Sequence, residues 1–271
     1  MKILLTGYKG FIGQNFLELA PKNWDIRLFE WGDDFPDVEG LDWVVHIGAI
    51  SSTTETDIDK IMNQNLNFSI KLFEECIKHE VNFQWSSSAS VYGLYSDFKE
   101  SSACKPVNLY AMSKYLFEQY IEKRKCHIKV QRFRYFNVYG KHEDHKGNQA
   151  SPIHQFSKQA KENGIIKVFE GSENYRRDFV PVEKIIETHI KMMKSRESGV
   201  WNVGTGFSMS FMDVAKIIAE KHNATIEEIP FPKNLKLQYQ HYTQADTTKL
   251  NESLSMLSKQ ENIENINKVI E

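Results

Sequence analysis

A tyrosine and a lysine four residues apart, Tyr110 and Lys114, are the residues of this chain whose types and spacing most directly suggest chemistry. On a helix these two positions lie on one face, one turn apart. A free tyrosine has a pKa near 10, and a lysine ammonium one turn away would favour the phenolate and suit the phenol to general acid–base catalysis. Ser88, upstream, offers a hydroxyl that could hold a substrate alcohol or carbonyl beside that phenol. Because surface helices often contain this spacing, the pair needs support from the elements around it.

Apolar patterns around these residues predict strands that alternate with helices. Residues 109–123, which carry Tyr110 and Lys114, have the spacing of a helix, and residues 83–87, just before Ser88, have that of a strand. Such alternation is typical of βαβ units in a parallel sheet. We therefore predict an α/β fold, with a Rossmann-type doubly wound parallel sheet and a smaller α+β substrate-binding lobe. The other predicted strands are 2–6, 25–30, 42–47 and 128–133, and the other predicted helices of this part are 11–20 and 62–77.

After Asn137 the composition changes, because polar and glycine-containing stretches interrupt the apolar pattern. Helices are predicted at 152–163 and 182–194, after a capping box at Ser210–Asp213, and in the tail beyond residue 253. A strand is expected at 201–203. We expect the Rossmann domain to take residues 1–136, 178–206 and about 244–252, and the second lobe to take residues 137–177, 207–243 and 253–271.

Three glycines, Gly7, Gly10 and Gly13, follow the first predicted strand and open the first predicted helix. This is the context that a dinucleotide-binding fingerprint requires, since glycines permit a tight turn and a close approach to a pyrophosphate. Glu30 lies 20 residues after Gly10 at the end of the second strand, where a carboxylate accepts hydrogen bonds from ribose hydroxyls and repels a 2′-phosphate. No Lys or Arg lies between Glu30 and Lys60 to offset that charge. The sequence therefore favours NAD over NADP as the cofactor.

The overall charge and composition argue against several other classes of protein. A formal net charge of −2 does not suit a partner that is a nucleic acid or a membrane surface. The chain begins with a short apolar strand and not with a signal-peptide pattern, and its longest apolar stretch is too short to span a bilayer. Three cysteines without the spacing of a metal site suit a reducing compartment. We expect a cytoplasmic protein.

Five further segments carry long, specific patterns: His46–Glu55, Arg134–Gly140, His145–Gly147, Phe169–Phe179 and Tyr239–Asp246. With the glycine turn and the Tyr110/Lys114 pair, these segments run through almost the whole chain. In this order they resemble the extended short-chain dehydrogenase/reductase superfamily and, inside it, the nucleotide-sugar epimerases of the ADP-L-glycero-D-manno-heptose 6-epimerase family. The resemblance implies a homo-oligomeric enzyme that uses tightly bound NAD(P) and acts on a nucleotide-sugar, ADP-heptose, in lipopolysaccharide biosynthesis.

The resemblance also implies roles for individual residues. Lys114 would bind the nicotinamide ribose, and a guanidinium at Arg177 suits a diphosphate because it can donate two parallel hydrogen bonds. The implied cofactor contacts are Gly7, Gly10, Phe11, Ile12, Gly13, Glu30, Gly48, Ala49, Ile50, Ser51, Gln64, Tyr110, Lys114 and Val138. The implied substrate contacts are Ser88, Asn137, Asn148, Phe169, Glu170, Gly171, Ser172, Arg177 and Tyr239.

The chain departs from the family pattern in two places. The family has a further strand and helix after its second strand, where this chain has only a short acidic stretch near residues 31–41. That unit normally helps to wall the adenine pocket, so the deletion bears on the affinity for the cofactor. Asn148 stands where the family usually has serine, and His154 falls one place before the expected histidine position, which is Gln155 here.

Inversion of a carbinol centre by oxidation and reduction is expected to need a second acid–base residue. Hydride returns from the side that took it, so the keto intermediate must present its other face and move its oxygen. In the resembled family a lysine that matches Lys146 has this role opposite the tyrosine. By itself, a lysine within the mixed-charge segment His142–Lys146 would be interpreted as solvated. The same segment could suggest a metal cluster, but the proposed chemistry needs no metal, and we predict none.

Three hypotheses follow from the sequence. The first is an NAD(P)-dependent epimerase that inverts C6 of the heptose in ADP-D-glycero-D-manno-heptose through a 6-keto intermediate. Its catalytic residues would be Ser88, Tyr110, Lys114 and Lys146. The second is another nucleotide-sugar epimerase, dehydratase or reductase of the same superfamily. The third is a catalytically inactive cofactor-binding protein, which the shortened adenine region favours and the retention of Tyr110 and Lys114 opposes.

Overall fold

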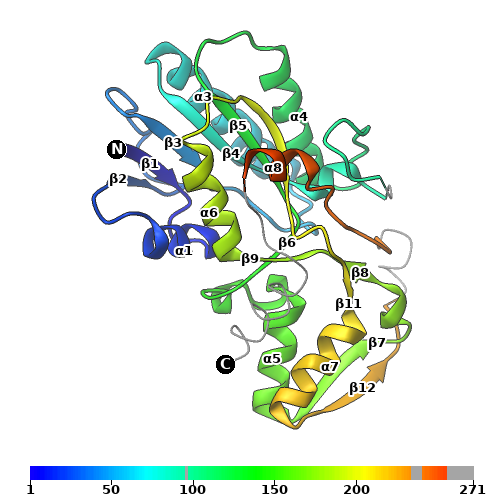
Figure 1. Ribbon diagram of the computed structural model, residues 1–271. Helices are drawn as coiled ribbons and strands as arrows, with labels where there is room; N and C mark the ends of the chain where they lie inside the picture. The colour runs from blue at the N-terminus through cyan, green and yellow to red at the C-terminus, as the bar shows by residue number, and fades with distance from the viewer. Residues whose placement is uncertain (95–96, 233–239, 255–271) are drawn as a thin grey trace. The chain divides into compact units, whose positions relative to one another are not determined.

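The computed structural model describes residues 1–94, 97–232 and 240–254 of the chain, and it divides the chain into two compact units (Figure 1). The first unit holds residues 1–93, 103–135 and 186–201, and the second holds residues 94–102, 136–185 and 202–271. The helix expected after residue 253 and the predicted substrate contact Tyr239 lie outside the described residues.

The first unit is built around a parallel sheet with the strand order β10-β5-β4-β3-β1-β2. Parallel ladders join β2 to β1, β1 to β3, β3 to β4 and β4 to β5. The predicted Rossmann-type α/β fold is thereby confirmed. The elements are β1 (Lys2–Thr6), α1 (Phe11–Leu19), β2 (Asp25–Phe29), β3 (Trp43–His46), α2 (Ile58–Ile61), a π-helical stretch (Met62–Asn67), α3 (Phe68–Lys78), β4 (Asn82–Ser88), a 3-10 turn (Ala89–Tyr92), α4 (Leu109–Lys123), β5 (Val130–Tyr135), α6 (Val182–Met192) and β10 (Gly199–Val203), the last two of which cross between the units.

Helices cover both faces of this sheet. Leu72 and Phe73 of α3 and Phe117 of α4 share one core cluster with the sheet residues Phe83 and Trp85. On the other face, the His189 ring of α6 packs against Phe133 of β5 and Phe16 of α1. The order in which strands are added reverses at β1, because β2 lies on one side of β1 and β3 lies on the other. In open α/β sheets, ligands bind at such a switch point, beyond the carboxyl ends of the strands.

Strand β2 is an edge strand, and only a short segment connects it to β3. Residues 30–42, all of them described, contain an isolated bridge between Trp31 and Asp33 but no helix and no strand of the sheet. The sheet therefore ends at β2, where the resembled family continues with a further strand.

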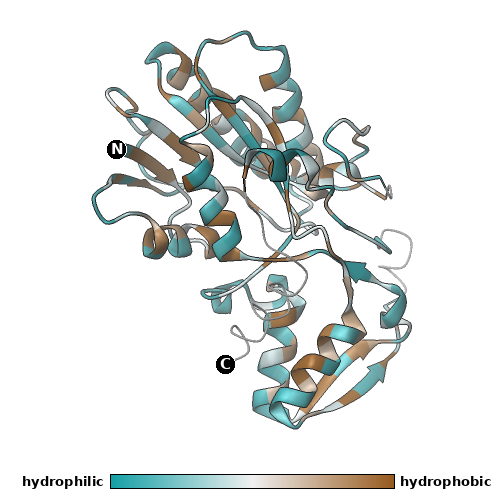
Figure 2. Cartoon of the chain, viewed as in Figure 1, coloured by the Kyte–Doolittle hydropathy of each residue, from teal (hydrophilic) through white to brown (hydrophobic). Residues whose placement is uncertain are grey.

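The second unit has its own core. Ile153 and Phe156 of α5 pack with Ile166 of β7 and with Val214 and Ile218 of α7. Figure 2 shows apolar residues along α7 of this unit and along β1 of the first. Its elements are β6 (Asn137–Tyr139), a 3-10 stretch (Asp144–Gln149), α5 (Pro152–Asn163), β7 (Ile165–Phe169), a 3-10 turn (Ser172–Asn174), β8 (Arg176–Arg177), β9 (Phe179–Pro181), β11 (Met209–Ser210), α7 (Phe211–His222), β12 (Thr225–Ile229) and α8 (Thr248–Ser253).

The observed division differs from the expected one at 94–102, 136, 178–185, 202–206 and 244–252, which group with the second unit. Hydrogen bonds explain this grouping. The buried Asp178 carboxylate accepts from the backbone N–H groups of Thr205, Gly206 and Ala245. Asn202 donates to the carbonyl of Phe98 over 2.6 Å. None of the described helices is both long and apolar enough to cross a membrane.

Candidate active site

The glycine turn after β1 is packed so closely that side chains would not fit. Gly7 has a φ of +72°, and a Cβ added to it would lie 2.4 Å from the Cα of Gly48. A Cβ on Gly13 would lie 2.2 Å from the carbonyl oxygen of Gly7. The turn leads directly into α1. The first N–H groups of that helix lack helical partners, so they suit an anion such as a pyrophosphate.

A small pocket of about 100 Å³ lies at the switch point of the sheet. It is far smaller than the several hundred Å³ typical of a whole-ligand pocket, so it suits one part of a dinucleotide. Six of the predicted cofactor residues line it, namely Gly7, Glu30, Gly48, Ala49, Ile50 and Gln64. The sequence reasoning missed the others, which are Thr6, Phe29, Trp31, His46 and Phe68, while the predicted contacts Phe11, Ile12 and Ser51 are not among its lining residues.

Glu30 is fixed at the edge of this pocket by backbone hydrogen bonds. Its carboxylate accepts from the N–H of Lys9 over 3.1 Å and from the N–H of Trp31 over 3.3 Å. The carboxylate is thus held where the fingerprint places an acceptor for ribose hydroxyls. The contact from Lys9 is made by its backbone N–H and not by its ammonium.

His46 lines the pocket as a neutral imidazole that bonds to two hydroxyl groups. Its Nδ1 lies 2.6 Å from the Thr6 hydroxyl and its Nε2 lies 2.7 Å from the Ser69 hydroxyl. Burial, with a smaller contribution from the charge of Lys114, lowers the pKa of His46 to about 3. A neutral imidazole has one donor and one acceptor, which matches a bridge between two hydroxyls.

Asn65, also missed from the sequence, links the pocket to helix α4. Its side-chain oxygen accepts from the N–H of Ile50 over 2.8 Å, and its amide donates to the Ile50 carbonyl over 2.9 Å and to the Ser113 hydroxyl over 3.1 Å. That hydroxyl in turn donates to the carbonyl of Tyr110 over 2.7 Å. Asn65 lies in the π-helical stretch, and such distortions often mark functional sites.

The predicted catalytic residues of the first unit are brought together. Ser88 ends strand β4, and its side chain shares a hydrogen bond with the Tyr110 hydroxyl. Helix α4, which carries Tyr110, begins at Leu109 because the Asn108 side chain accepts a hydrogen bond from the N–H of Ala111 over 2.8 Å. The ammonium of Lys114 lies 5.9 Å from the centre of the Tyr110 ring.

The expected lowering of the Tyr110 pKa by Lys114 was wrong for this structure. Burial raises the pKa of Tyr110, and the hydrogen bond from Ser88 offsets only part of that rise. The Lys114 ammonium donates over 2.7 Å to the carbonyl of Ser86 and lies 4.8 Å from the centre of the Trp85 ring. Burial lowers the pKa of Lys114 to about 7, against a smaller raising effect of Glu118. Loss of hydration thus decides both pKa values.

A buried ion pair supports the same helix one turn further on. Glu118 accepts from the Ser87 hydroxyl over 2.5 Å and from two nitrogens of Arg134, at 3.0 Å from Nε and 2.5 Å from the terminal nitrogen. Both side chains are almost fully buried, and the guanidinium also lies 4.8 Å from the centre of the Tyr92 ring. The pair joins α4 to β4 and β5, which is the framework that positions Ser88 and Tyr110.

Lys146, the predicted second base, lies in the second unit and pairs with Glu143. Its ammonium is 3.5 Å from Glu143, whose buried carboxylate also accepts from the backbone N–H groups of Gly140 and Ser151. One acidic side chain thus ties Gly140 to Ser151 across this segment. Because Tyr110 belongs to the first unit, the arrangement of two opposed bases stays a prediction.

Arg177, predicted to bind a diphosphate, is buried, so it is not a solvated charge. It donates to the carbonyl of Arg176 over 2.9 Å, and its guanidinium lies 5.3 Å from the centre of the Phe211 ring. Ser172 is also buried, and its hydroxyl has no hydrogen-bond partner among the described residues. The chain runs from the end of β7 through Phe169, Glu170 and Gly171 into the 3-10 turn that begins at Ser172. Of the other predicted contacts, Asn137 and Val138 lie on β6, and Asn148 is exposed.

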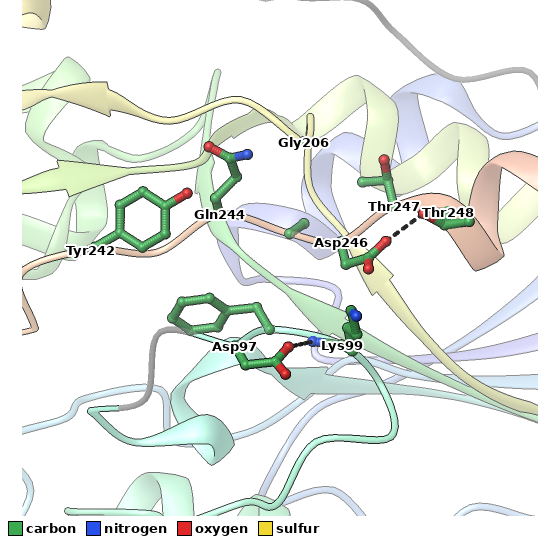
Figure 3. Close-up of a pocket in the computed structure, with 10 residues that line it drawn as sticks. Asp97, Lys99, Gly206, Tyr242, Gln244, Asp246, Thr247 and Thr248 are labelled. Atoms are coloured by element: carbon green, nitrogen blue, oxygen red, sulfur yellow. Dashed lines mark hydrogen bonds between the residues drawn. The ribbon is translucent and has the colours of Figure 1, made fainter.

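A larger, open and polar pocket of about 520 Å³ in the second unit holds none of the predicted site residues. Figure 3 shows Asp97 and Lys99 opposite Gln244, Asp246 and Thr248, with the Asp246 carboxylate bound to Thr248. No three His, Cys, Asp or Glu side chains within residues 1–94, 97–232 and 240–254 are grouped in a way that could hold a metal ion.

Comparison with known proteins places these residues in a family. Residues 20–204 match the model of the NAD dependent epimerase/dehydratase family, a range that includes Tyr110, Lys114, Lys146 and Arg177 but not the glycine turn.

Three solved structures resemble the fold. The ADP-L-glycero-D-manno-heptose-6-epimerase of Helicobacter pylori is 24% identical, with a TM-score of 0.85 over 99% of this chain and 96% of that one. A UDP-N-acetylglucosamine 4-epimerase of Methanobrevibacter ruminantium, in complex with UDP-N-acetylmuramic acid, is 22% identical, with a TM-score of 0.90 over 99% and 96%. The UDP-glucose 4-epimerase of Thermus thermophilus, in complex with NAD, is 23% identical, with a TM-score of 0.82 over 100% and 99%.

Proposed function

The chain belongs to the NAD dependent epimerase/dehydratase family, and we propose that it is an epimerase that inverts C6 of the heptose in ADP-D-glycero-D-manno-heptose. The observation that carries the proposal is the joining of Ser88 and Tyr110 by a hydrogen bond, with Lys114 one turn further along α4. The motifs spread along the chain and the similarity to a heptose epimerase structure support this substrate. We further propose that the enzyme is a cytoplasmic homo-oligomer. The exposed apolar side chains of Met112 and Leu116 on α4 would lie in the interface between its subunits.

NAD is the proposed cofactor, with NADP as the alternative. The closely packed glycines and the fixed Glu30 carboxylate fit a dinucleotide, because added side chains would block the turn. When bound, NAD would accept a hydride from the carbinol carbon and return it. Gly7, Gly10 and Gly13 would admit its pyrophosphate, with the backbone of Phe11 and Ile12. Gly48–Ser51, Gln64, Lys114 and Val138 would complete the site.

In this proposal Tyr110 exchanges the proton of the substrate oxygen at C6, and Ser88 holds that oxygen beside it. In the oxidation Tyr110, as the phenolate, would take the proton of the C6 hydroxyl, and in the reduction the Lys146 ammonium would return a proton to the oxygen. Because burial raises the pKa of Tyr110, the phenolate is the minor form at neutral pH. The nucleotide-sugar would be held by residues of the second unit, namely Asn137, Asn148, Phe169, Glu170, Gly171, Ser172, Arg177 and Tyr239.

Lys146 would serve the other face of the sugar. The two epimers place the oxygen at different positions relative to the carbon that exchanges hydride, so one fixed phenol cannot serve both. Pairing with Glu143 would hold the ammonium in place for this second proton transfer.

Incubation with ADP-D-glycero-D-manno-heptose in D₂O tests the reaction. Direct hydride return predicts product inverted at C6 that carries no deuterium at that carbon, which proton NMR detects. Deuterium at C6 would contradict transient oxidation there, and failure to convert this substrate would contradict the substrate assignment.

A second candidate is an epimerase or dehydratase that acts on another nucleotide-sugar, which the breadth of the family and the similarity to UDP-sugar epimerases favour. The variant Lys146→Ala discriminates between the two. The two-base scheme predicts a fall in kcat of about 10²-fold or more, because one proton transfer loses its catalyst. The control is Lys158→Ala, which removes an exposed ammonium from α5. An unchanged kcat for Lys146→Ala would favour the second candidate.

A further inference from the structure

The segment after β2 folds into a tight turn that displays one side chain. The N–H of Glu30 donates to the Asp33 carboxylate over 2.8 Å, and the N–H of Asp33 donates to the carbonyl of Glu30 over 3.1 Å. Gly32, inside the turn, has a φ of +105°, a conformation that favours glycine. The turn thus presents Trp31 beside Glu30 at the edge strand, where the chain lacks a further strand and helix.

Trp31 lines the small pocket of the first unit and is nevertheless half exposed. Half of its surface, 50%, remains accessible, whereas Trp43, Trp85 and Trp201 are buried. A single exposed apolar residue is ordinary by itself. This residue, however, lines a pocket together with the glycine backbone at Gly7 and Gly48 and the fixed carboxylate of Glu30.

An aromatic cluster holds Trp31 in place. Its ring meets the edge of Phe68 at a centroid distance of 5.8 Å and an angle of 79°. One face of Phe68 is already covered by the stacked ring of Phe29 at 5.0 Å, and Phe35 and His46 pack against it at 5.7 Å. Phe68 therefore serves as support, and Trp31 is the residue that offers an exposed aromatic surface to a ligand.

We propose that Trp31 stacks on the adenine ring of the dinucleotide cofactor and forms one wall of its pocket. The inference rests on the cofactor of the proposed function. Three observations carry it: the exposed aromatic surface, the adjacent Glu30 carboxylate fixed for ribose hydroxyls, and a pocket sized for part of a dinucleotide. Stacking on an aromatic side chain recognises the flat face of a base.

The test uses full-length protein freed of nucleotide, with AMP and nicotinamide mononucleotide as separate probes of the two halves of the cofactor. Base stacking contributes about 1–3 kcal/mol, so Trp31→Ala should weaken AMP binding by about 5- to 150-fold in calorimetry. Binding of nicotinamide mononucleotide should not change, and Trp31→Phe should retain part of the AMP affinity. AMP should quench the tryptophan fluorescence of the wild type and of the control Trp24→Phe, but not that of Trp31→Phe.

The outcomes separate this inference from the proposed function. Equal AMP affinity in the wild type and in a folded Trp31→Ala variant would overturn the stacking role alone. A wild type that binds neither AMP nor NAD would overturn the cofactor proposal together with it. If AMP binding depends on Trp31 while the heptose substrate is not converted, the stacking role stands and the substrate assignment fails.

Discussion

Tyr110 is the residue on which the proposed chemistry depends. Its hydroxyl bonds to Ser88, while Lys114 bonds to the Ser86 carbonyl, so each group has a defined partner. We predict that Tyr110→Phe lowers kcat by about 10²- to 10⁴-fold, because it removes a proton donor and acceptor. Its unfolding temperature should stay close to that of the wild type, since the ring remains. Tyr120→Phe is the matched control, because it removes a hydroxyl from the same helix that binds Glu74.

Gly13 and Gly10 belong to one motif but tolerate a methyl group differently. A Cβ on Gly13 would lie 2.2 Å from the Gly7 carbonyl oxygen, whereas one on Gly10 would lie 3.3 Å from the same atom. Gly13→Ala should therefore displace the turn and lower both NAD affinity and the unfolding temperature. Gly10→Ala should have the smaller effect in both measurements. Equal effects would show that the close approach of α1 to the turn is not what the third glycine provides.

At the scale of elements, helix α4 is positioned by the Glu118–Arg134 pair. Removal of one partner leaves a buried charge, which typically costs about 3–5 kcal/mol. We expect such a loss in the free energy of unfolding for Glu118→Gln in urea titrations. The double variant Glu118→Met/Arg134→Met should recover most of it, because no charge is left unpaired. The exposed pair of Lys158 and Glu162 on α5 is the control, and Glu162→Gln should change stability by less than about 1 kcal/mol.

The boundaries of elements were predictable where local chemistry sets them. Helices 109–123 and 152–163 were predicted at their observed bounds, since Asn108 and Ser151 cap their starts and Gly164 ends the second in a left-handed conformation. The capping box at Ser210–Asp213 was also confirmed. Strand β5, expected at 128–133, lies at Val130–Tyr135, because its register follows pairing with β4. Short strands such as β7 and β12 were missed, since their pairing joins segments distant in sequence.

The candidate site was predictable in its motifs but not in its supports. Gly7 and Glu30 were found because a local turn and a strand end require them, whereas Gly48 followed from the family resemblance, and the three share one pocket. Trp31 and Asn65 were not found, since an aromatic in an acidic stretch and an asparagine in a helix gain meaning only from their tertiary neighbours. The pKa of Tyr110 was misjudged for the same reason, because burial is a property of the folded chain.

At the scale of the whole molecule, two buried histidines link stability to pH. His46 bridges Thr6 and Ser69, while His189 bonds through Nδ1 to Gln84 over 2.7 Å and through Nε2 to the Tyr135 hydroxyl. Burial lowers the pKa of each to about 3. The ordinary value is near 6.5, so between pH 6.5 and pH 3 the unfolded chain binds protons that the folded chain does not.

Stability should therefore fall as the pH is lowered through this window, by on the order of 2 kcal/mol per histidine at pH 5. Urea unfolding of His189→Gln between pH 7 and pH 4.5 measures this contribution. The variant should lose less stability on acidification than the wild type, because one proton-binding group is gone from its unfolded state. His127→Gln, which removes an exposed imidazole near Glu80, is the control and should follow the wild-type slope more closely. Parallel curves for His189→Gln and the wild type would mean that His189 is protonated in the folded protein as readily as in the unfolded chain.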